Sequence, residues 1–598
     1  MIGALSFWFL SRPFTFSEND GQLYAFMALA RLDPHRFGGD LFIRFGSQDA
    51  FSIFSPIYGA LIRLVGLTAA TMALLILGAA LWLAGCWRLA RSVLEANRAA
   101  VVVIIFCVLH ITYGGFSALY VSEALLTSRI FAEAFVLLGL AELARGAGLR
   151  AALLLILAAA LHPIMALGGL ATAAVWESFR RPWLLAVGAA ALLAAAALAL
   201  TGLPPFDRLL AVMDGPWLAA VEHRDGFVFL ANWIAGDWAN VFAQASVVLA
   251  AALISHGPRR WFFLSILIIA AGALAASAIG GDLLHSVLII QLQLWRATWL
   301  LAWAGVVALF VLASDARRLA EWVVPALFAV ALIFAQQVWL LDALAVIGLL
   351  GVVRGYVLPA WAAHTLIALC ALIFAGFVVS QVELAISTFA WARHLGLTPW
   401  SYKQIRWAIA LTVAPLFVLA LFRRPAALPL FAGVLLVLSA ATWDQRNAWQ
   451  KLIMNGGVSV SAPSPVLWSE DVAPTWFLLR APSWLSLQQA SGLLFSRQTA
   501  LTWAARAPTT RGIVRPTVWR PAEPPLTCAQ VDPVVTVGDL RSICANPDHP
   551  GAIILDRATA GAPSADFTTP VDRVSICRTA TSLEARRSHV FYVYRCGA

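Results

Sequence analysis

The stretch LTAATMALLILGAALWLAGCWRLAR, residues 67–91, is an apolar run of about 20 residues followed by two arginines, Arg88 and Arg91. In a helix, such a run matches the hydrocarbon thickness of a bilayer. Arginines directly after it mark a cytoplasmic end, because loops that stay in the cytoplasm carry the positive charge. The stretch therefore predicts a transmembrane helix that ends on the cytoplasmic side.

The same alternation of apolar runs and arginine clusters continues to about residue 445. Of the 598 residues, 61% are hydrophobic and 12% are charged. The later clusters are Arg145 and Arg150, Arg180 and Arg181, Arg259 and Arg260, Arg317 and Arg318, and Arg423 and Arg424. This composition excludes a soluble protein and predicts a polytopic α-helical membrane protein of about 13 to 15 membrane segments. Because the clusters lie in loops, the net charge of +10 does not indicate nucleic-acid binding.

Two apolar stretches, residues 151–178 and 322–353, are too long for one span and too short for two. Each must turn back on itself if every arginine cluster is to stay in the cytoplasm. Pro163 follows His162 in the first stretch and interrupts helical hydrogen bonding, so we expect a break there. His162 is then either a packing residue or part of a polar cavity.

Placing the N-terminus inside puts residues 17–60, 204–238 and 280–294, and everything after about residue 445, on the outer side. The segment before residue 17 is short for a span and contains Arg12 and Pro13. We expect a short, tilted first helix or a start further upstream rather than a cleaved signal peptide, since no basic region or small-residue cleavage site is present.

The sequence predicts that the C-terminal region forms a separate outer domain. Residues 1–450 form the membrane domain with its first periplasmic loop at 17–60, and residues 451–598 form a small periplasmic α/β domain. Its expected strands are DPVVTV (532–537), GAIILD (551–556) and SHVFYVYRC (588–596). Its aromatic start contains Trp468, Trp476 and Trp484, which either line a sugar-binding surface or anchor the domain at the membrane interface.

Four cysteines, Cys528, Cys544, Cys577 and Cys596, fall in this outer domain. Their spacing does not fit a zinc ribbon, and an even number in a polar tail predicts two disulfides, which form in an oxidising compartment such as the periplasm. Four cysteines allow three pairings. We favour Cys528 with Cys544 and Cys577 with Cys596.

The first outer loop carries most of the candidate chemistry. ENDGQLYAFMALARL, residues 18–32, begins with two acids and continues as an amphipathic helix, which we expect to lie in the membrane interface. Glu18, Asp20, Asp40 and Asp49 are thereby placed at the outer surface, where a carboxylate stays ionised and meets lipid headgroups. The alternative for Glu18 and Asp20 is that they only cap the following helix.

An acid at the start of the first outer loop, a Tyr24-bearing helix, a dozen or so spans and an outer C-terminal domain together resemble the C-type (GT-C) superfamily of integral-membrane glycosyltransferases. The resemblance implies an enzyme that takes a sugar from a polyprenyl-phosphate carrier, with a first-loop carboxylate as general base. Carried over, Asp20 is the base and Glu18 is the second acid of the pair. The short first helix departs from the superfamily pattern.

Sugar transfer from a phosphate needs a base for the acceptor and a cation for the departing phosphate. Arg129 and Glu133 lie four residues apart on one helix face, either as an ion pair or with Glu133 orienting Arg129 toward a phosphate. Arg296, near Gln291 at a helix entrance, is a second phosphate candidate or an interfacial anchor. The expected substrate-binding residues are Arg129, Glu133, His162, Arg296, Gln291, Tyr24, Asp40 and Asp49.

The outer loop at residues 206–238 is rich in charged residues and predicts a polar lid. No acid cluster has tight ligand spacing, so we assign no metal site, and a divalent cation remains only an option. No phosphate-binding glycine loop, dinucleotide fingerprint or hydrolase motif occurs, which disfavours nucleotide-sugar donors.

We therefore expect a glycosyltransferase of the bacterial inner membrane. It would move a sugar from an isoprenoid-phosphate donor to a glycan, lipid or protein acceptor on the periplasmic side, with the lipid bilayer and no nucleic acid among its partners. The alternatives are a transporter or flippase of lipid-linked saccharides and an O-antigen-type polymerase or ligase.

Overall fold

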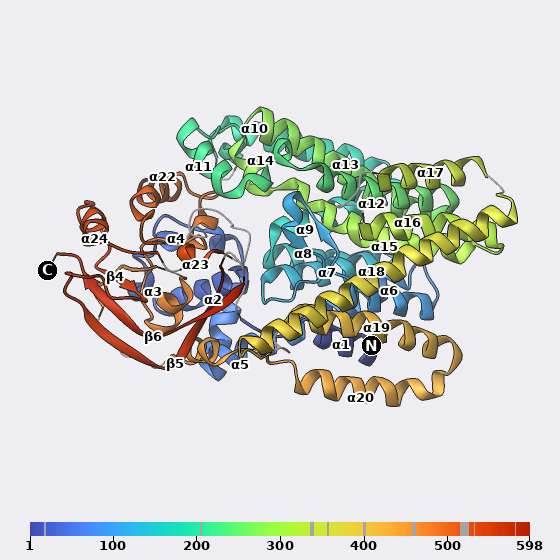
Figure 1. The fold of residues 1–598 in the computed structure, drawn as a ribbon. Helices are drawn as coiled ribbons and strands as arrows, with labels where there is room; N and C mark the ends of the chain where they lie inside the picture. The colour runs from blue at the N-terminus through green and yellow to red at the C-terminus, as the bar shows by residue number, and fades with distance from the viewer. Residues whose placement is uncertain are drawn as a thin grey trace.

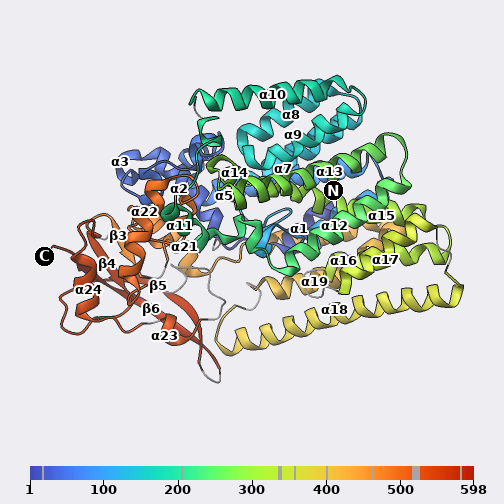
Figure 2. The same cartoon turned by 90° about the horizontal axis from the view of Figure 1, so that it is seen from above.

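The computed structural model joins a bundle of apolar helices to a smaller outer domain that ends at the C-terminus (Figure 1). It describes residues 1–16, 19–203, 206–334, 340–355, 358–398, 402–456, 458, 462–469, 471–514, 526–531, 533–579 and 582–597. Figure 2 shows the same two parts from above, with the bundle on one side and the strands on the other.

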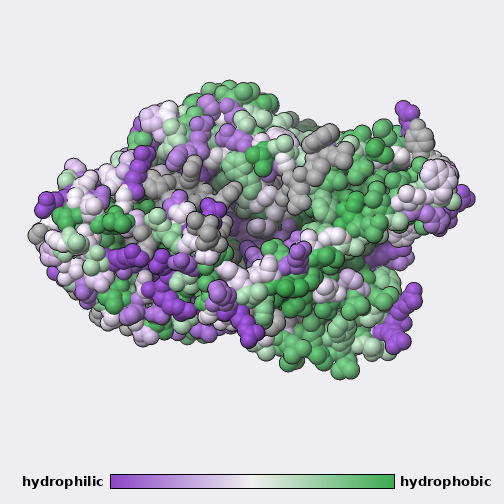
Figure 3. Space-filling model, in the orientation of Figure 1, coloured by the Kyte–Doolittle hydropathy of each residue, from purple (hydrophilic) through white to green (hydrophobic). Residues whose placement is uncertain are grey.

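The bundle contains helices of very different lengths. Its helices are α1 (Ile2–Ser11), α5 (Phe54–Ala90), α6 (Ala96–Val108), α7 (Ser128–Ala144), α8 (Gly148–Leu161), α9 (Pro163–Ser178), α10 (Trp183–Leu200), α12 (Ala235–Ile254), α13 (Gly257–Ser277), α15 (Thr298–Asp315), α16 (Val323–Phe334), α17 (Leu340–Arg354), α18 (Ala360–His394), α19 (Lys403–Arg423) and α20 (Leu428–Ala441). Figure 3 shows hydrophobic residues over much of the bundle surface and more hydrophilic ones over the outer domain.

Among the described residues, seven helices are long and apolar enough to cross a membrane. The length and composition of these helices fit a multi-pass membrane protein. The expected 13 to 15 segments exceed this number because several apolar helices are short. The 14 residues of α8, for example, rise only about 21 Å, less than the ~30 Å hydrocarbon core.

The expected breaks in the apolar segments are confirmed. The first awkward stretch divides at His162 into α8 and α9, and His162 caps α9 by accepting a hydrogen bond at Nδ1 from the Met165 N–H (3.3 Å). The second divides into α16 and α17, which pack together. Within α5 the backbone leaves the helical region at Gly66 (φ 80°, ψ 164°), directly before the apolar run that begins at residue 67.

The amphipathic pattern predicts that the first outer loop lies in a membrane interface, whereas the structure buries its longest helix against other parts of the protein. The loop forms α2 (Asn19–Leu32), α3 (Pro34–Phe37), α4 (Leu41–Arg44) and the short 3-10 helix η1 (Gln48–Phe51). Most of α2 is buried, and its Phe26 ring stacks on Trp476 of the outer domain with centroids 4.0 Å apart. The loop is therefore packed between the bundle and the outer domain (Figure 1).

The outer domain is a four-stranded sheet with short helices, which confirms the expected α/β class. The strand order is β3 (Val466–Trp468), β4 (Ala552–Leu555), β6 (Leu583–Arg595), β5 (Ala565–Arg578). Strand β3 is parallel to β4, and the other neighbours are antiparallel. The helices are α21 (Ala448–Asn455), α22 (Arg497–Arg506), α23 (Cys528–Val531) and α24 (Val537–Cys544).

Two of the three expected strands are present, as β4 and β6. The segment at 532–537 is not a strand in its described part, residues 533–537, because Thr536 caps α24 instead. The Thr536 hydroxyl oxygen accepts from the Asp539 N–H (3.2 Å), and the Asp539 carboxylate accepts from the Thr536 N–H (2.8 Å). This capping box outweighs the β propensity of the valines that precede it.

Trp476 and Trp484 form neither an exposed sugar surface nor a membrane anchor, whereas Trp468 lines a cavity between the outer domain and the bundle. Trp476 and Trp484 are fully buried, and Trp468 is almost so. Trp468 packs edge-on against Phe567 and Phe591 of the sheet. Burial of these rings stabilises the outer domain and its contact with α2.

The favoured disulfide pairing is wrong. The bonds join Cys528 to Cys577 and Cys544 to Cys596, with Cα atoms 4.7 and 5.1 Å apart. Cys577 is in register with Glu584 near the start of β6, whereas Cys596 follows the end of that strand. The 13 residues of β6 span about 40 Å, which exceeds the reach of a disulfide.

Proteolysis of the purified protein without reductant is expected to release two linked peptide pairs, Cys528 with Cys577 and Cys544 with Cys596. Changing Cys577→Ser should leave Cys528 as a new free thiol while Cys544 stays protected from alkylation, as measured by mass spectrometry. A linked peptide that contains both Cys577 and Cys596 would contradict the strand register.

Candidate functional site

A cavity of about 560 Å³ lies where the bundle, the first outer loop and the outer domain meet. Its walls come from α2, the break before α9, the end of α11 (Gly215–Asp225) and outer-domain residues 485–495. A second cavity of about 780 Å³ lies among the segment after α1, residues 118–125, α18 and α19. Asp20, Arg129, Ala118 and Leu119 line both cavities.

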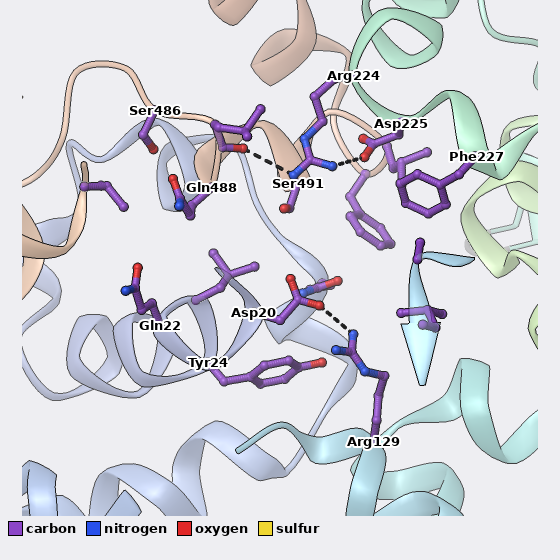
Figure 4. A pocket seen from close by; sticks show the side chains of 18 of the residues that line it. Asp20, Gln22, Tyr24, Arg129, Arg224, Asp225, Phe227, Ser486, Gln488 and Ser491 are labelled. Carbon is purple, nitrogen blue, oxygen red and sulfur yellow. Dashed lines mark hydrogen bonds and ion pairs between the residues drawn. The ribbon is translucent and has the colours of Figure 1, made fainter. Parts of the chain in front are cut away.

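An arginine between two carboxylates occupies this shared wall. The Arg129 Nη1 atom lies 2.7 Å from the Asp20 carboxylate (Figure 4). Its Nε and Nη2 atoms contact the two oxygens of Glu123 at 2.9 and 2.8 Å. Arg129 and Glu123 side chains are each 6% exposed, whereas Asp20 is 36% exposed. Glu123 therefore fixes the guanidinium, which presents its remaining edge to the accessible Asp20.

The local sequence explains this geometry. Thr127 caps α7, because its hydroxyl oxygen accepts from the Arg129 N–H (3.2 Å) while the hydroxyl donates to Glu123 (3.0 Å). Asp20 lies in the first turn of α2, where the helix dipole favours a negative charge. Helix capping and ion pairing thus hold the cluster together from both sides.

The expected partnership of Arg129 with Glu133 is wrong. Glu133 instead accepts hydrogen bonds from Trp82 Nε1 (2.8 Å) and the Ser122 N–H (3.4 Å). The side chain of Arg129, at the start of α7, turns toward the preceding loop and so meets Glu123. Sequence reasoning missed Glu123, although SEALLTSR (122–129) carries an acid, a capping threonine and an arginine directly before the expected span.

The charges of this cluster determine its protonation. Burial alone would raise the pKa of Asp20, but the positive charge of Arg129 and its hydrogen bond lower that pKa below its ordinary value. Burial raises the pKa of Glu123, against the opposing effect of Arg129. Asp20 is therefore an ionised carboxylate at neutral pH that reaches both cavities.

Arg296 provides a second buried cation near the same cavity. It belongs to the short helix η7 (Leu294–Ala297) and is 9% exposed. Its Nε atom donates to Gln293 (2.9 Å), and its guanidinium lies 5.6 Å from the ring centroid of Trp295. It forms no ion pair with a carboxylate in the described part of the chain. An anion in the cavity would neutralise it.

His162 and Arg224 add further donors to the cavity wall. Because His162 Nδ1 accepts from Met165, the ring proton of a neutral imidazole is on Nε2 and can be donated. Arg224 pairs with Asp225 and donates to the Leu487 carbonyl oxygen (3.5 Å). The bundle and α11 thus contribute Arg129, Arg224 and Arg296 to the cavity wall. The outer domain contributes Asp471 and Arg573, and Arg573 pairs with Asp556 (2.7 Å).

An apolar annex of about 210 Å³ adjoins the main cavity and shares Tyr24, Gln48, His162, Ile164 and Phe495 with it. Its further apolar lining comes from Met27, Phe51, Leu161, Pro163, Leu288 and Leu292. Of the expected substrate-binding residues, Tyr24 and His162 line both spaces.

Asp49 and Gln291 line the annex and already have protein partners there. Asp49 accepts from Arg31 (2.5 Å). Gln291 accepts from Arg208 (3.1 Å) and donates to the Leu494 carbonyl oxygen (3.0 Å). Both side chains therefore tie segments of the annex wall together.

Asp40 does not line either cavity, contrary to expectation. It is completely buried between α4 and the outer domain, where protein donors occupy both carboxylate oxygens. Burial raises its pKa despite these hydrogen bonds. A carboxylate saturated in this way is structural rather than a substrate ligand.

The second expected acid, Glu18, lies outside the described residues. Within the residues that the structure does describe, no three or more His, Cys, Asp or Glu side chains are grouped closely enough to hold a metal ion. The optional divalent cation thus has no ligand set there.

Comparison with known proteins adds no relative: no family model, curated protein or solved structure matches this chain.

The two buried glutamates offer a direct test of the Arg129 environment. Glu123→Gln removes a charge that contacts Arg129 and should lower the free energy of unfolding by about 1 to 3 kcal/mol. Glu133→Gln keeps the hydrogen bond from Trp82 and replaces a buried acid that has no cation contact, so stability should stay within about 1 kcal/mol. Denaturant unfolding in detergent measures the stability of both variants. A larger loss of stability in Glu133→Gln than in Glu123→Gln would make Glu133 the partner of Arg129.

Proposed function

We propose that this chain is a membrane glycosyltransferase that moves a sugar from a polyprenyl-phosphate donor to a hydroxyl of an acceptor. The observation that carries the proposal is the position of Asp20, an ionised carboxylate in the wall shared by two cavities. One of these cavities also holds Arg296, a buried arginine without a carboxylate partner among the described residues. A base between two substrate spaces is what a transfer between two bound molecules requires.

The phosphate of the donor fits beside Arg296, His162 and Arg129. These side chains line one cavity, and the guanidinium of Arg296 has no described carboxylate partner, so a phosphate there replaces a missing negative charge. The adjoining apolar annex suits the first prenyl units of a lipid carrier. A water-soluble nucleotide sugar would leave this annex unused.

The acceptor hydroxyl would approach Asp20 from the 780 Å³ cavity. Its oxygen forms a bond to the anomeric carbon while the bond from that carbon to the phosphate oxygen breaks. The electron pair of the broken bond leaves with the polyprenyl phosphate, stabilised by the arginines, and the hydroxyl proton passes to Asp20. One displacement inverts the anomeric configuration and needs no carboxylate nucleophile.

The outer domain indicates the compartment. Its two disulfides are compatible with a compartment where thiols are oxidised, and the arginine clusters of the bundle favour the opposite side of the membrane for the loops that carry them. We assign the protein to a bacterial inner membrane with the cavities on the periplasmic side. The acceptor is a glycan, lipid or protein that carries a free hydroxyl.

Asp20→Asn should lower the turnover about 100-fold or more, because an amide does not accept the hydroxyl proton. Asp33→Asn is the matched control, since Asp33 is an exposed acid in the same loop that caps α3. Both variants are assayed in proteoliposomes with a panel of polyprenyl-phosphate sugars, and the products are identified by mass spectrometry.

Equal turnover by Asp20→Asn and the wild type would remove Asp20 from the mechanism. Movement of an unchanged lipid-linked saccharide across the bilayer, with no new glycosidic bond, would favour a flippase instead.

The pH profile tests the influence of Arg129 on the base. Because Arg129 holds the pKa of Asp20 below its ordinary value, wild-type activity should persist as the pH falls from 7 to about 5. In Arg129→Gln only the smaller effects of Arg296 and Arg224 oppose the burial of Asp20. The pKa of Asp20 therefore rises, and activity is lost at a higher pH as the solution is acidified. Arg129→Lys retains the charge and should keep this loss near the wild-type pH. Identical profiles for the Gln variant and the wild type would exclude Asp20 as the titrating base.

A further inference from the structure

Outer-domain residues 485–491 form one part of the wall of the main cavity, and the polar side chains in this part carry no charge. Ser486, Gln488 and Ser491 lie across the cavity from Asp20 and Gln22 of α2 (Figure 4). We propose that this segment, residues 483–491, contacts the sugar of the donor, and that the buried Asp40 positions it. The inference rests on the proposed glycosyl transfer and names the part of the protein that recognises the sugar.

The distribution of polar groups supports this assignment. The three outer-domain side chains end in hydroxyl or amide groups, as does Gln22 opposite them. Such groups both donate and accept hydrogen bonds, as sugar hydroxyls do. Arg129 and Arg296 come from the bundle side of the cavity. A sugar phosphate would therefore place its phosphate against the bundle and its ring against the outer domain.

Asp40 binds this wall from behind. One carboxylate oxygen accepts from the Phe42 N–H (2.9 Å) and Gln489 Nε2 (2.8 Å). The other accepts from Trp476 Nε1 and the Ser483 N–H, both at 2.8 Å. Gln489 also donates to the Ser483 carbonyl oxygen (2.8 Å). The carboxylate thus fixes both ends of the segment that carries Ser486 and Gln488.

Three side-chain donors also bind backbone carbonyl groups of this outer-domain wall. Trp503 Nε1 donates to the Ser486 carbonyl oxygen (3.1 Å), and Arg224 donates to that of Leu487 (3.5 Å). Trp217 Nε1 donates to the Leu493 carbonyl oxygen (2.7 Å). These donors anchor carbonyl groups, and the side chains of Ser486 and Ser491 line the cavity. The Ser486 hydroxyl oxygen also accepts from the Gln489 N–H (3.1 Å) and keeps its own proton for a ligand. The segment is therefore fixed in position while its hydroxyl groups face the cavity.

An aspartate is required at position 40 by this geometry. Four donors converge on two oxygens. An asparagine of the same shape would present an amide NH₂ group to two of these donors and lose their hydrogen bonds. Asp40→Asn is thus a nearly isosteric change that loosens the wall without adding volume to the core.

The experiment compares Asp40→Asn with the exposed control Asp33→Asn in transfer assays. It uses polyprenyl-phosphate donors whose sugars differ at a single hydroxyl. Loss of wall alignment should raise the donor KM of Asp40→Asn about 10-fold and reduce discrimination between the donors by a similar factor, with kcat much less affected. Asp33→Asn should match the wild type in donor KM, in donor discrimination and in kcat.

Hydrogen exchange separates positioning from contact. In Asp40→Asn the amides of residues 483–491 should exchange faster, while those of β4 and β6 keep their protection. Gln488→Ala and Ser491→Ala should raise the donor KM and relax discrimination without faster exchange. These two variants also cover the case in which Asp40→Asn fails to fold.

A wild-type protein that transfers sugar while the Gln488 and Ser491 variants retain its KM and donor discrimination would overturn this inference and leave the proposed function standing. A wild-type protein that transfers sugar from no polyprenyl-phosphate donor would overturn both.

Discussion

The arrangement of the site depends on one buried cation, Arg129, and on the two carboxylates that neutralise it. Glu123 precedes the same helix, whereas Asp20 comes from α2. A guanidinium at 6% exposure is costly unless paired, so this cation constrains the first outer loop to dock against α7. The same contact places an accessible carboxylate between two cavities. Stability of the loop and position of the candidate base therefore have a single physical origin.

The sequence reveals the elements whose causes are local. Apolar length identifies the long apolar helices, Pro163 marks a break, and the alternating residues of β6 identify a strand. It also identifies Asp20, Tyr24, Arg129, His162 and Arg296, which line the main cavity. In each case the residue type and its distance from a helix end carry the information.

Contacts between distant segments could not be predicted in this way. The partner of Arg129 depends on how the loop before α7 turns, and the pairing of Cys577 depends on the register of β5 with β6. Asp40 was expected at a substrate because it is an acid in an outer loop, yet its donors Trp476, Ser483 and Gln489 lie more than 430 positions later in the chain. No periodicity in the first loop records those partners.

Helix α18 is both a wall of the second cavity and a long helix with an exposed apolar surface. Its 35 residues extend about 52 Å, well beyond the ~30 Å hydrocarbon core, and most of its surface is exposed. Such a helix adapts to bilayer thickness by tilting. Gln381 and Leu384 on α18 line the 780 Å³ cavity, so a change of tilt moves one of its walls. In a membrane, the thickness of the bilayer would thereby bear on the width of that cavity.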